Sequence, residues 1–165
     1  MTSGGMGEMG VALPAAIGAS FATNRGPVLC LHCDGGMMMN LQELATIAHH
    51  SLPIKIIVFS NDGYAMIKHT QKVLGLGSVA VDRASGVSFP NFIDCAHSFG
   101  IPAARVDSWL QWEIHAANFF SRKGPMLLDV RISPMQPLVP KLNPIRHPDG
   151  SIESPRFDQL SPERA

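Results

Sequence analysis

The chain has 165 residues, of which 45% are hydrophobic and 16% charged, so it has the apolar content of a folded protein and too much for a disordered one. Lys plus Arg and Asp plus Glu each total 13, and the resulting zero net charge argues against nucleic acid or an anionic membrane as a partner. No apolar run reaches the roughly 18 residues of a membrane span, no signal-peptide pattern opens the chain, and three cysteines cannot all pair, so we expect a cytoplasmic protein.

The first part of the chain predicts helix, strand, helix and strand in that order. Small residues that follow four early glycines predict a helix that ends before Gly26. Residues 28–32 form a short apolar run between turn signals, which indicates a buried strand. Residues 41–50 have helical apolar spacing, with Asn40 as the expected N-cap. Residues 54–60 are β-branched and almost wholly apolar, which is typical of a strand buried on both faces.

The alternation continues in the second part. We expect helices over residues 64–74, 89–99 and 108–121, and strands over residues 103–106 and 126–132. Residues 75–88 are expected to form a loop. Strands that alternate with helices predict the α/β class, with an open parallel sheet flanked by helices. In such a sheet, ligands bind at the carboxyl ends of the strands.

The character of the sequence changes after residue 132. Residues 133–165 contain seven prolines and little periodicity. We therefore predict a single domain over residues 1–132, followed by an extended Pro-rich C-terminal arm over residues 133–165.

Polar turn residues directly follow two of the predicted strands. Asp34, Gly35 and Gly36 follow the first, and Asn61 begins an Asn-Asp-Gly turn after the second. Neighbouring parallel strands would bring both turns to one sheet edge, where carboxylate and amide oxygens suit Mg²⁺ and glycine amides can approach phosphate. This pattern favours a Mg²⁺–diphosphate site; the alternative is two ordinary turns of an α/β protein.

Three segments together resemble the cofactor-diphosphate-binding (PP) domain of thiamine diphosphate enzymes, in the acetolactate synthase-like group. They are residues 2–19 (TSGGMGEMGVALPAAIGA), residues 33–48 (CDGGMMMNLQELATIA) with the Asn61 turn, and residues 123–132 (KGPMLLDVRI). The resemblance implies a Rossmann-like thiamine diphosphate-binding fold and the cofactors thiamine diphosphate and Mg²⁺. It also makes FAD a candidate cofactor of the full enzyme.

The resemblance implies roles for nine residues of this chain. The Asp34 carboxylate, the Asn61 side chain and the Gly63 carbonyl would bind Mg²⁺, and the amides of Gly35 and Gly36 would hold the diphosphate. The remaining four residues would contact the organic part of the cofactor. The Gly7 carbonyl and the Met9 amide would bind its pyrimidine, with the Met9 side chain beneath it, while Met66 and Ile67 would line the thiazolium and substrate side.

The sequence departs from the family pattern at three positions close to these nine residues. Cys33 stands where the motif usually begins with glycine, and Ser60 replaces the first residue of an Asn-Asn pair. Thr70 occupies the place where acetolactate synthases usually carry tryptophan. A relative that acts on another small 2-oxo acid or acceptor is therefore as well supported as acetolactate synthesis.

The glutamate that activates the cofactor in this family belongs to a separate pyrimidine-binding (PYR) domain, and no segment here resembles that domain. We therefore expect no catalytic residue in this chain, and activity only in a homo- or hetero-oligomer that includes a PYR domain or subunit. The alternatives are a non-catalytic binding or assembly module, the PP subunit of a split sulfopyruvate- or phosphonopyruvate-type decarboxylase, and an unrelated Mg²⁺-dependent phosphate-binding protein.

Overall fold

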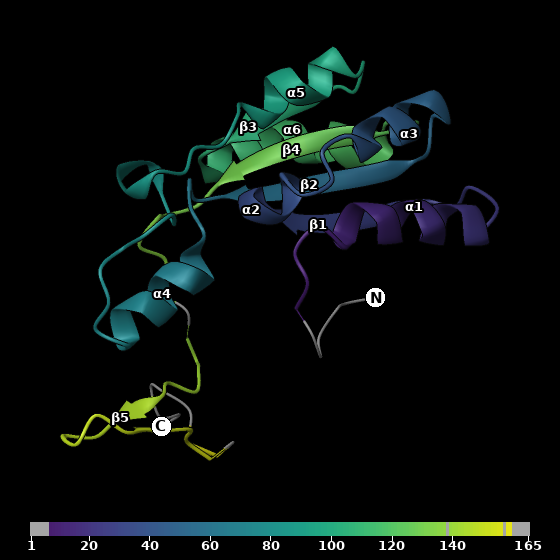
Figure 1. The fold of residues 1–165 in the computed structure, drawn as a ribbon. Coiled ribbons are helices and arrows are strands. Elements are labelled where there is room, and N and C mark those ends of the chain that lie inside the picture. Colours follow the sequence, from purple (N-terminus) through teal and green to yellow (C-terminus); the bar gives the residue numbers. More distant parts are fainter. Residues whose placement is uncertain (1–6, 138, 157, 160–165) are drawn as a thin grey trace. The chain divides into compact units, whose positions relative to one another are not determined.

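The protein is described by a computed structural model over residues 7–137, 139–156 and 158–159 (Figure 1). Two compact units can be distinguished, residues 1–62 with 88–132 and residues 63–87 with 133–165. The first unit contains α1 (Ala12–Ala22), β1 (Val28–Cys33), α2 (Asp34–Met37), α3 (Glu43–His49), β2 (Ile54–Ser60), α5 (Phe92–Ser98), β3 (Ala103–Val106), α6 (Trp109–Ser121) and β4 (Met126–Arg131). The second contains α4 (Ala65–Val73), the 3₁₀ turn η1 (Arg83–Ser85), β5 (Ile145–Arg146) and β6 (Ile152–Glu153).

The first unit is built on a four-stranded sheet in the order β1-β2-β4-β3. All of its strand pairs are parallel, and the ends of three strands lie level, since Cys33 pairs with Phe59 and Ser60 with Arg131. The apolar β2 lies between β1 and β4 and is almost entirely buried, as its continuous apolar run predicts. The predicted class, an open parallel sheet flanked by helices, is confirmed. None of the described helices is long and apolar enough to cross a bilayer.

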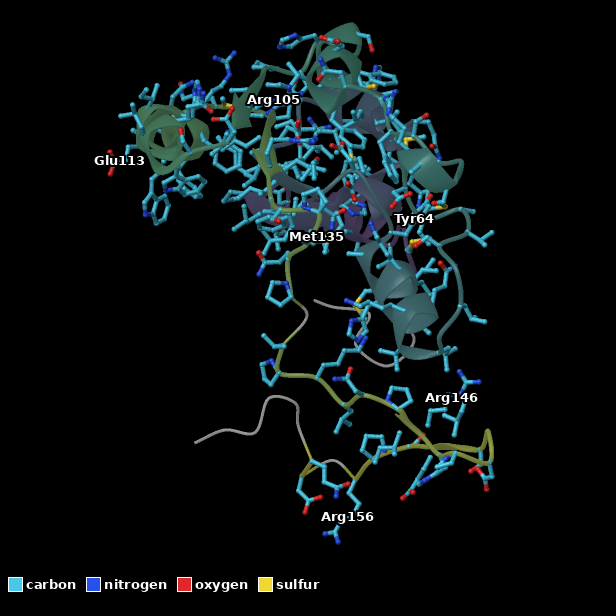
Figure 2. All side chains as sticks on the ribbon, turned by 90° about the vertical axis from the view of Figure 1, so that its left-hand side faces the viewer. Tyr64, Arg105, Glu113, Met135, Arg146 and Arg156 are labelled. Carbon is cyan, nitrogen blue, oxygen red and sulfur yellow. The ribbon has the colours of Figure 1, made fainter. Side chains whose placement is uncertain are left out.

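Apolar side chains form a core on each face of this sheet. The larger cluster joins residues of α1, α3 and α5 to one face, and the smaller one joins Phe119 of α6 to Ile57, Met126 and Leu128 on the other. The opposite side of α6 is exposed and carries apolar side chains such as Leu110 and Ile114 beside polar ones, and Glu113 points away from the sheet (Figure 2). Of the described helices, α6 alone contributes to the smaller cluster, which makes Phe119 its central side chain.

Several helix boundaries differ from the sequence-based expectations. Asn40 is not the N-cap of α3, which begins at Glu43; its side-chain amide donates instead to the carbonyl of Gly10 at 2.8 Å. The short α2 was not predicted, because its Asp-Gly-Gly start is typical of a turn. Helix α5 begins at Phe92 rather than near residue 89, with the Asn91 side chain as its N-cap acceptor.

The second unit joins α4 to the C-terminal segment. Part of the predicted C-terminal arm is not extended alone, because β5 and β6 pair antiparallel within residues 139–156. The segment is tied to α4 by hydrogen bonds, in which the Arg146 guanidinium donates to the carbonyl of Leu74 at 3.1 Å and His69 pairs with Asn143 at 2.9 Å.

A buried lysine links β2 to the end of α6. The Lys55 ammonium group donates to the carbonyls of Arg122 and Gly124, both at 2.7 Å, and burial lowers the pKa of Lys55. Methionine fills a similar volume and leaves both carbonyls without this donor, so we expect Lys55→Met to lower the free energy of unfolding by about 1–3 kcal/mol. Urea unfolding measures this loss, with the exposed Lys123→Met as control. Equal stability of the two variants would show that the hydrogen bonds contribute nothing.

Candidate functional site

One buried carboxylate holds the two polar turns together. Asp34 begins α2 directly after β1, and its side chain is only 2% exposed. Its Oδ1 accepts the backbone N–H of Gly35 at 2.8 Å, while its Oδ2 accepts the N–H groups of Asn61 at 2.9 Å and of Asp62 at 2.8 Å. The parallel pairing of β1 with β2 therefore brings the turns to one edge of the sheet, as the spacing predicts.

The turn after β1 requires a glycine at position 36 because a histidine packs beneath it. A Cβ atom on Gly36 would lie 2.6 Å from Cε1 of His32. The His32 ring is buried, its Nδ1 accepts the N–H of Cys33 at 3.1 Å, and burial lowers its pKa. The neutral His32 ring thus packs beneath the turn. Because Gly36 has no side chain, no Cβ atom of its own covers its backbone.

The segment that precedes α1 lies against the same turn. Gly10 has a positive φ of 87° and no room for a side chain, since a Cβ atom there would lie 2.7 Å from Cβ of Met39. The hydrogen bond from Asn40 to the Gly10 carbonyl fixes this approach. Gly7 and the half-exposed Met9 therefore belong to a segment anchored beside the turn. Residues 2–6 of the family-like segment lie outside the described residues.

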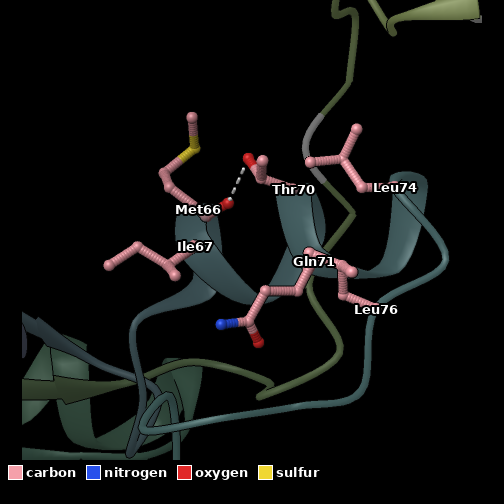
Figure 3. Close-up of a pocket in the computed structure, with 6 residues that line it drawn as sticks. All are labelled: Met66, Ile67, Thr70, Gln71, Leu74 and Leu76. Atoms are coloured by element: carbon pink, nitrogen blue, oxygen red, sulfur yellow. Dashed lines mark hydrogen bonds between the residues drawn. The ribbon is translucent and has the colours of Figure 1, made fainter. Parts of the chain in front are cut away.

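The other three predicted site residues fall in the second unit. Gly63 forms a bridge with Asp82, and a Cβ atom at Gly63 would lie 2.8 Å from the Val81 carbonyl oxygen. Met66 and Ile67 are exposed on α4. They line a hollow of about 260 Å³ together with Thr70, Gln71, Leu74 and Leu76 (Figure 3).

A salt bridge organises the loop that follows α4. The Lys68 ammonium group donates to Asp82 at 2.8 Å, and Asp82 accepts from both the hydroxyl and the N–H of Ser85. These bonds, that of Lys68 first, lower the pKa of Asp82 from 3.8 to about 2.

Because the pKa of Asp82 is lower in the folded state, its contribution to stability is present above the ordinary aspartate pKa and is lost as the pH falls through about 2. We therefore expect the Ser85 amide resonance to shift with a midpoint near pH 2 in an NMR titration. Asp82→Asn serves as the control and should remove the transition. A midpoint near pH 4 would contradict the pairing.

The side-chain oxygen atoms at the sheet edge are suitable ligands for a magnesium ion. A carboxylate and a carboxamide are hard oxygen ligands, which Mg²⁺ takes together with phosphate oxygens and water. The Asp34 carboxylate is already oriented by the amides of both turns. Within the described part of the chain, no group of three or more His, Cys, Asp or Glu side chains is placed to hold a metal. A metal at this edge would therefore also use neutral oxygen ligands.

Comparison with known proteins assigns the chain to a family. The model for the thiamine pyrophosphate enzyme C-terminal TPP (thiamine diphosphate) binding domain matches residues 1–130. The chain belongs to this family. Its relatives include the acetolactate synthase isozyme 1 large subunit of Escherichia coli, 34% identical over 87% of this chain, and a probable acetolactate synthase large subunit of Methanocaldococcus jannaschii, 35% identical over 97% of this chain.

A solved structure also resembles this fold. The thiamine diphosphate-dependent 4-hydroxybenzoylformate decarboxylase of Rhodococcus jostii RHA1 is similar with a TM-score of 0.67 and 25% identity, over 76% of this chain and 23% of that one. The chain spans only 25% of the E. coli large subunit and 28% of the M. jannaschii protein. The chain therefore spans about a quarter of the length of these similar proteins.

Sequence reasoning missed one pair of side chains at this edge. The Arg131 guanidinium, at the end of β4, contacts the carboxylate of Asp62 in the second turn. The two residues are 69 positions apart, and only the order of the strands places them together. No local pattern in the sequence signals this contact.

Proposed function

We propose that this chain is the Mg²⁺-dependent thiamine diphosphate-binding part of an acetolactate synthase-like enzyme that decarboxylates or ligates small 2-oxo acids in the cytoplasm. The observation that carries the proposal is the Asp34 carboxylate, which accepts hydrogen bonds from the turns after both β1 and β2. In a chain of the TPP-binding family, this geometry supports a metal held between the two turns.

In this proposal, the chain binds the charged end of the cofactor. Asp34, the Asn61 side chain and the Gly63 carbonyl are the protein ligands of Mg²⁺, and the backbone amides of Gly35 and Gly36 face diphosphate oxygens. The Gly35 N–H donates to Asp34 Oδ1 in this structure, so it would have to be shared between that carboxylate and a diphosphate oxygen. Fixed dipoles and a metal can neutralise a diphosphate without a basic patch, in keeping with the zero net charge.

The organic part of the cofactor would contact apolar and backbone groups. The Gly7 carbonyl and the Met9 amide bind the pyrimidine, the Met9 side chain supports it, and Met66 and Ile67 line the substrate side. The exposure of Met9, Met66 and Ile67 supports this role, because large apolar side chains are available for contact. The chemistry that thiamine diphosphate supplies when bound is the stabilisation of negative charge on the carbonyl carbon of a 2-oxo acid.

The activating glutamate would come from a PYR domain on a partner or on another part of the enzyme. Two observations support a polypeptide partner of this kind. The chain corresponds to about a quarter of its relatives. In addition, β1 is an edge strand of its sheet, and it carries the exposed side chains of Leu29 and Leu31. Alone, the chain would bind cofactor without turnover.

Titration calorimetry of the chain with thiamine diphosphate tests the proposal against its alternatives. We expect binding with Mg²⁺ and none with excess EDTA, and affinity for Mg²⁺–ADP at least about tenfold weaker, because the pyrimidine contacts are specific. Equal affinity for ADP would favour an unrelated phosphate-binding protein, and no binding of either ligand would favour an assembly module.

A further inference from the structure

Asp62 has a backbone conformation that few residues adopt. Its φ of 58° lies in the left-handed region, where aspartate is tolerated at some cost in energy. The same residue donates its N–H to Oδ2 of Asp34, next to the N–H of Asn61. The orientation of the Asp34 carboxylate therefore depends on Asp62 keeping this unusual conformation.

The guanidinium of Arg131, on the neighbouring strand β4, donates hydrogen bonds to the carboxylate of Asp62. Its Nη1 donates to Oδ1 of Asp62 at 3.1 Å, and its Nη2 donates to Oδ2 of the same carboxylate, so the pair is bidentate. The backbone beneath Arg131 is fixed as well, because Arg131 pairs with Ser60 and the N–H of Ile132 donates to the Ser60 carbonyl at 3.0 Å. A planar guanidinium on a rigid strand can hold a carboxylate in one orientation.

We propose that Arg131 is a positioning residue that keeps the second turn in the conformation required to orient Asp34. The chain of contacts runs from the guanidinium of Arg131 to the carboxylate of Asp62, and from the backbone of Asp62 to the carboxylate of Asp34. This proposal rests on the proposed function in one respect, that Asp34 is a magnesium ligand. The contact chain itself can be tested without any ligand.

The first test measures the amide hydrogen exchange of residues 61 and 62 by NMR in the ligand-free protein. If Arg131 holds the turn, Arg131→Met and Asp62→Asn should each accelerate exchange at both amides by about three- to tenfold, as expected for a partly exposed bidentate pair. Arg131→Lys should not restore slow exchange, because an ammonium group cannot form the bidentate contact. The matched control is Arg105→Met, which breaks the ion pair of Arg105 with Asp129.

The second test separates positioning from simple charge in titrations with Mg²⁺ alone, without the anionic diphosphate. A cation near a metal site repels the metal, so a pure charge effect would strengthen Mg²⁺ binding in Arg131→Met and weaken it in Asp62→Asn. Positioning predicts that both variants bind about three- to tenfold more weakly and that the double variant is no worse than either single one.

Unchanged exchange at residues 61 and 62 in Arg131→Met would overturn the proposal, as would opposite effects of the two single variants on binding. Failure of the proposed function has a different signature. The amides would still respond to the substitutions, while the wild-type chain would bind no thiamine diphosphate in the presence of Mg²⁺.

Discussion

Replacing Asp34 by asparagine should weaken the Mg²⁺-dependent binding of thiamine diphosphate by about a hundredfold or more, since it removes a charged ligand of the metal. Asparagine keeps the size of the side chain but loses the negative charge. Its amide nitrogen also cannot accept from a backbone N–H, so the bonds from Gly35, Asn61 and Asp62 cannot all persist. Both the charge and the orientation of the site are therefore lost.

Calorimetric titration with thiamine diphosphate at saturating Mg²⁺ measures the effect of Asp34→Asn. The matched control is Asp107→Asn, which makes the same chemical change at an exposed position of the first unit. The control should bind like the wild-type chain. If Asp34→Asn retained wild-type affinity, Asp34 would not be a metal ligand.

Replacing Phe119 by alanine should lower the free energy of unfolding by about 3–5 kcal/mol. Phe119 is fully buried at the centre of the cluster between α6 and the sheet, where it packs with Ile57, Met126 and Leu128. Of the described helices, only α6 contributes to this cluster. No side chain of another described helix is therefore present in the cluster to fill the cavity left by the ring.

The next residue supplies a matched control. Phe120 is 56% exposed and contacts the Phe119 ring edge-to-face with centroids 5.1 Å apart. Phe120→Ala should therefore cost no more than about 1 kcal/mol, mainly the loss of this aromatic contact. Urea unfolding of both variants, followed by circular dichroism, gives the comparison. Equal losses would show that α6 is not anchored through Phe119.

The sheet could be predicted from sequence because its strands carry local signals. The apolar run of residues 54–60 and the weaker run of residues 103–106 predict β2 and β3 with the bounds that the structure has. The meeting of the turns at Asp34 and Asn61 also followed from one rule, that neighbouring parallel strands end at the same edge.

The features that sequence reasoning missed depend on tertiary contacts. Asn40 is a good N-cap by residue type, but its side-chain amide donates instead to the carbonyl of Gly10, 30 positions earlier in the chain. Arg131 belongs to a segment that predicts only a strand, and its partner Asp62 becomes its neighbour through the β2–β4 pairing. Local patterns do not encode such contacts, whereas the order of strands does.

In the proposed site, the two turns hold a metal together with a diphosphate. Electron–nuclear double resonance, with Mn²⁺ in place of Mg²⁺ and thiamine diphosphate added to the full chain, tests this arrangement most directly. We expect hyperfine coupling between Mn²⁺ and ³¹P in the wild-type complex, and its loss in Asp34→Asn. Bound Mn²⁺ without ³¹P coupling, or coupling that survives in Asp34→Asn, would contradict the assignment of the site.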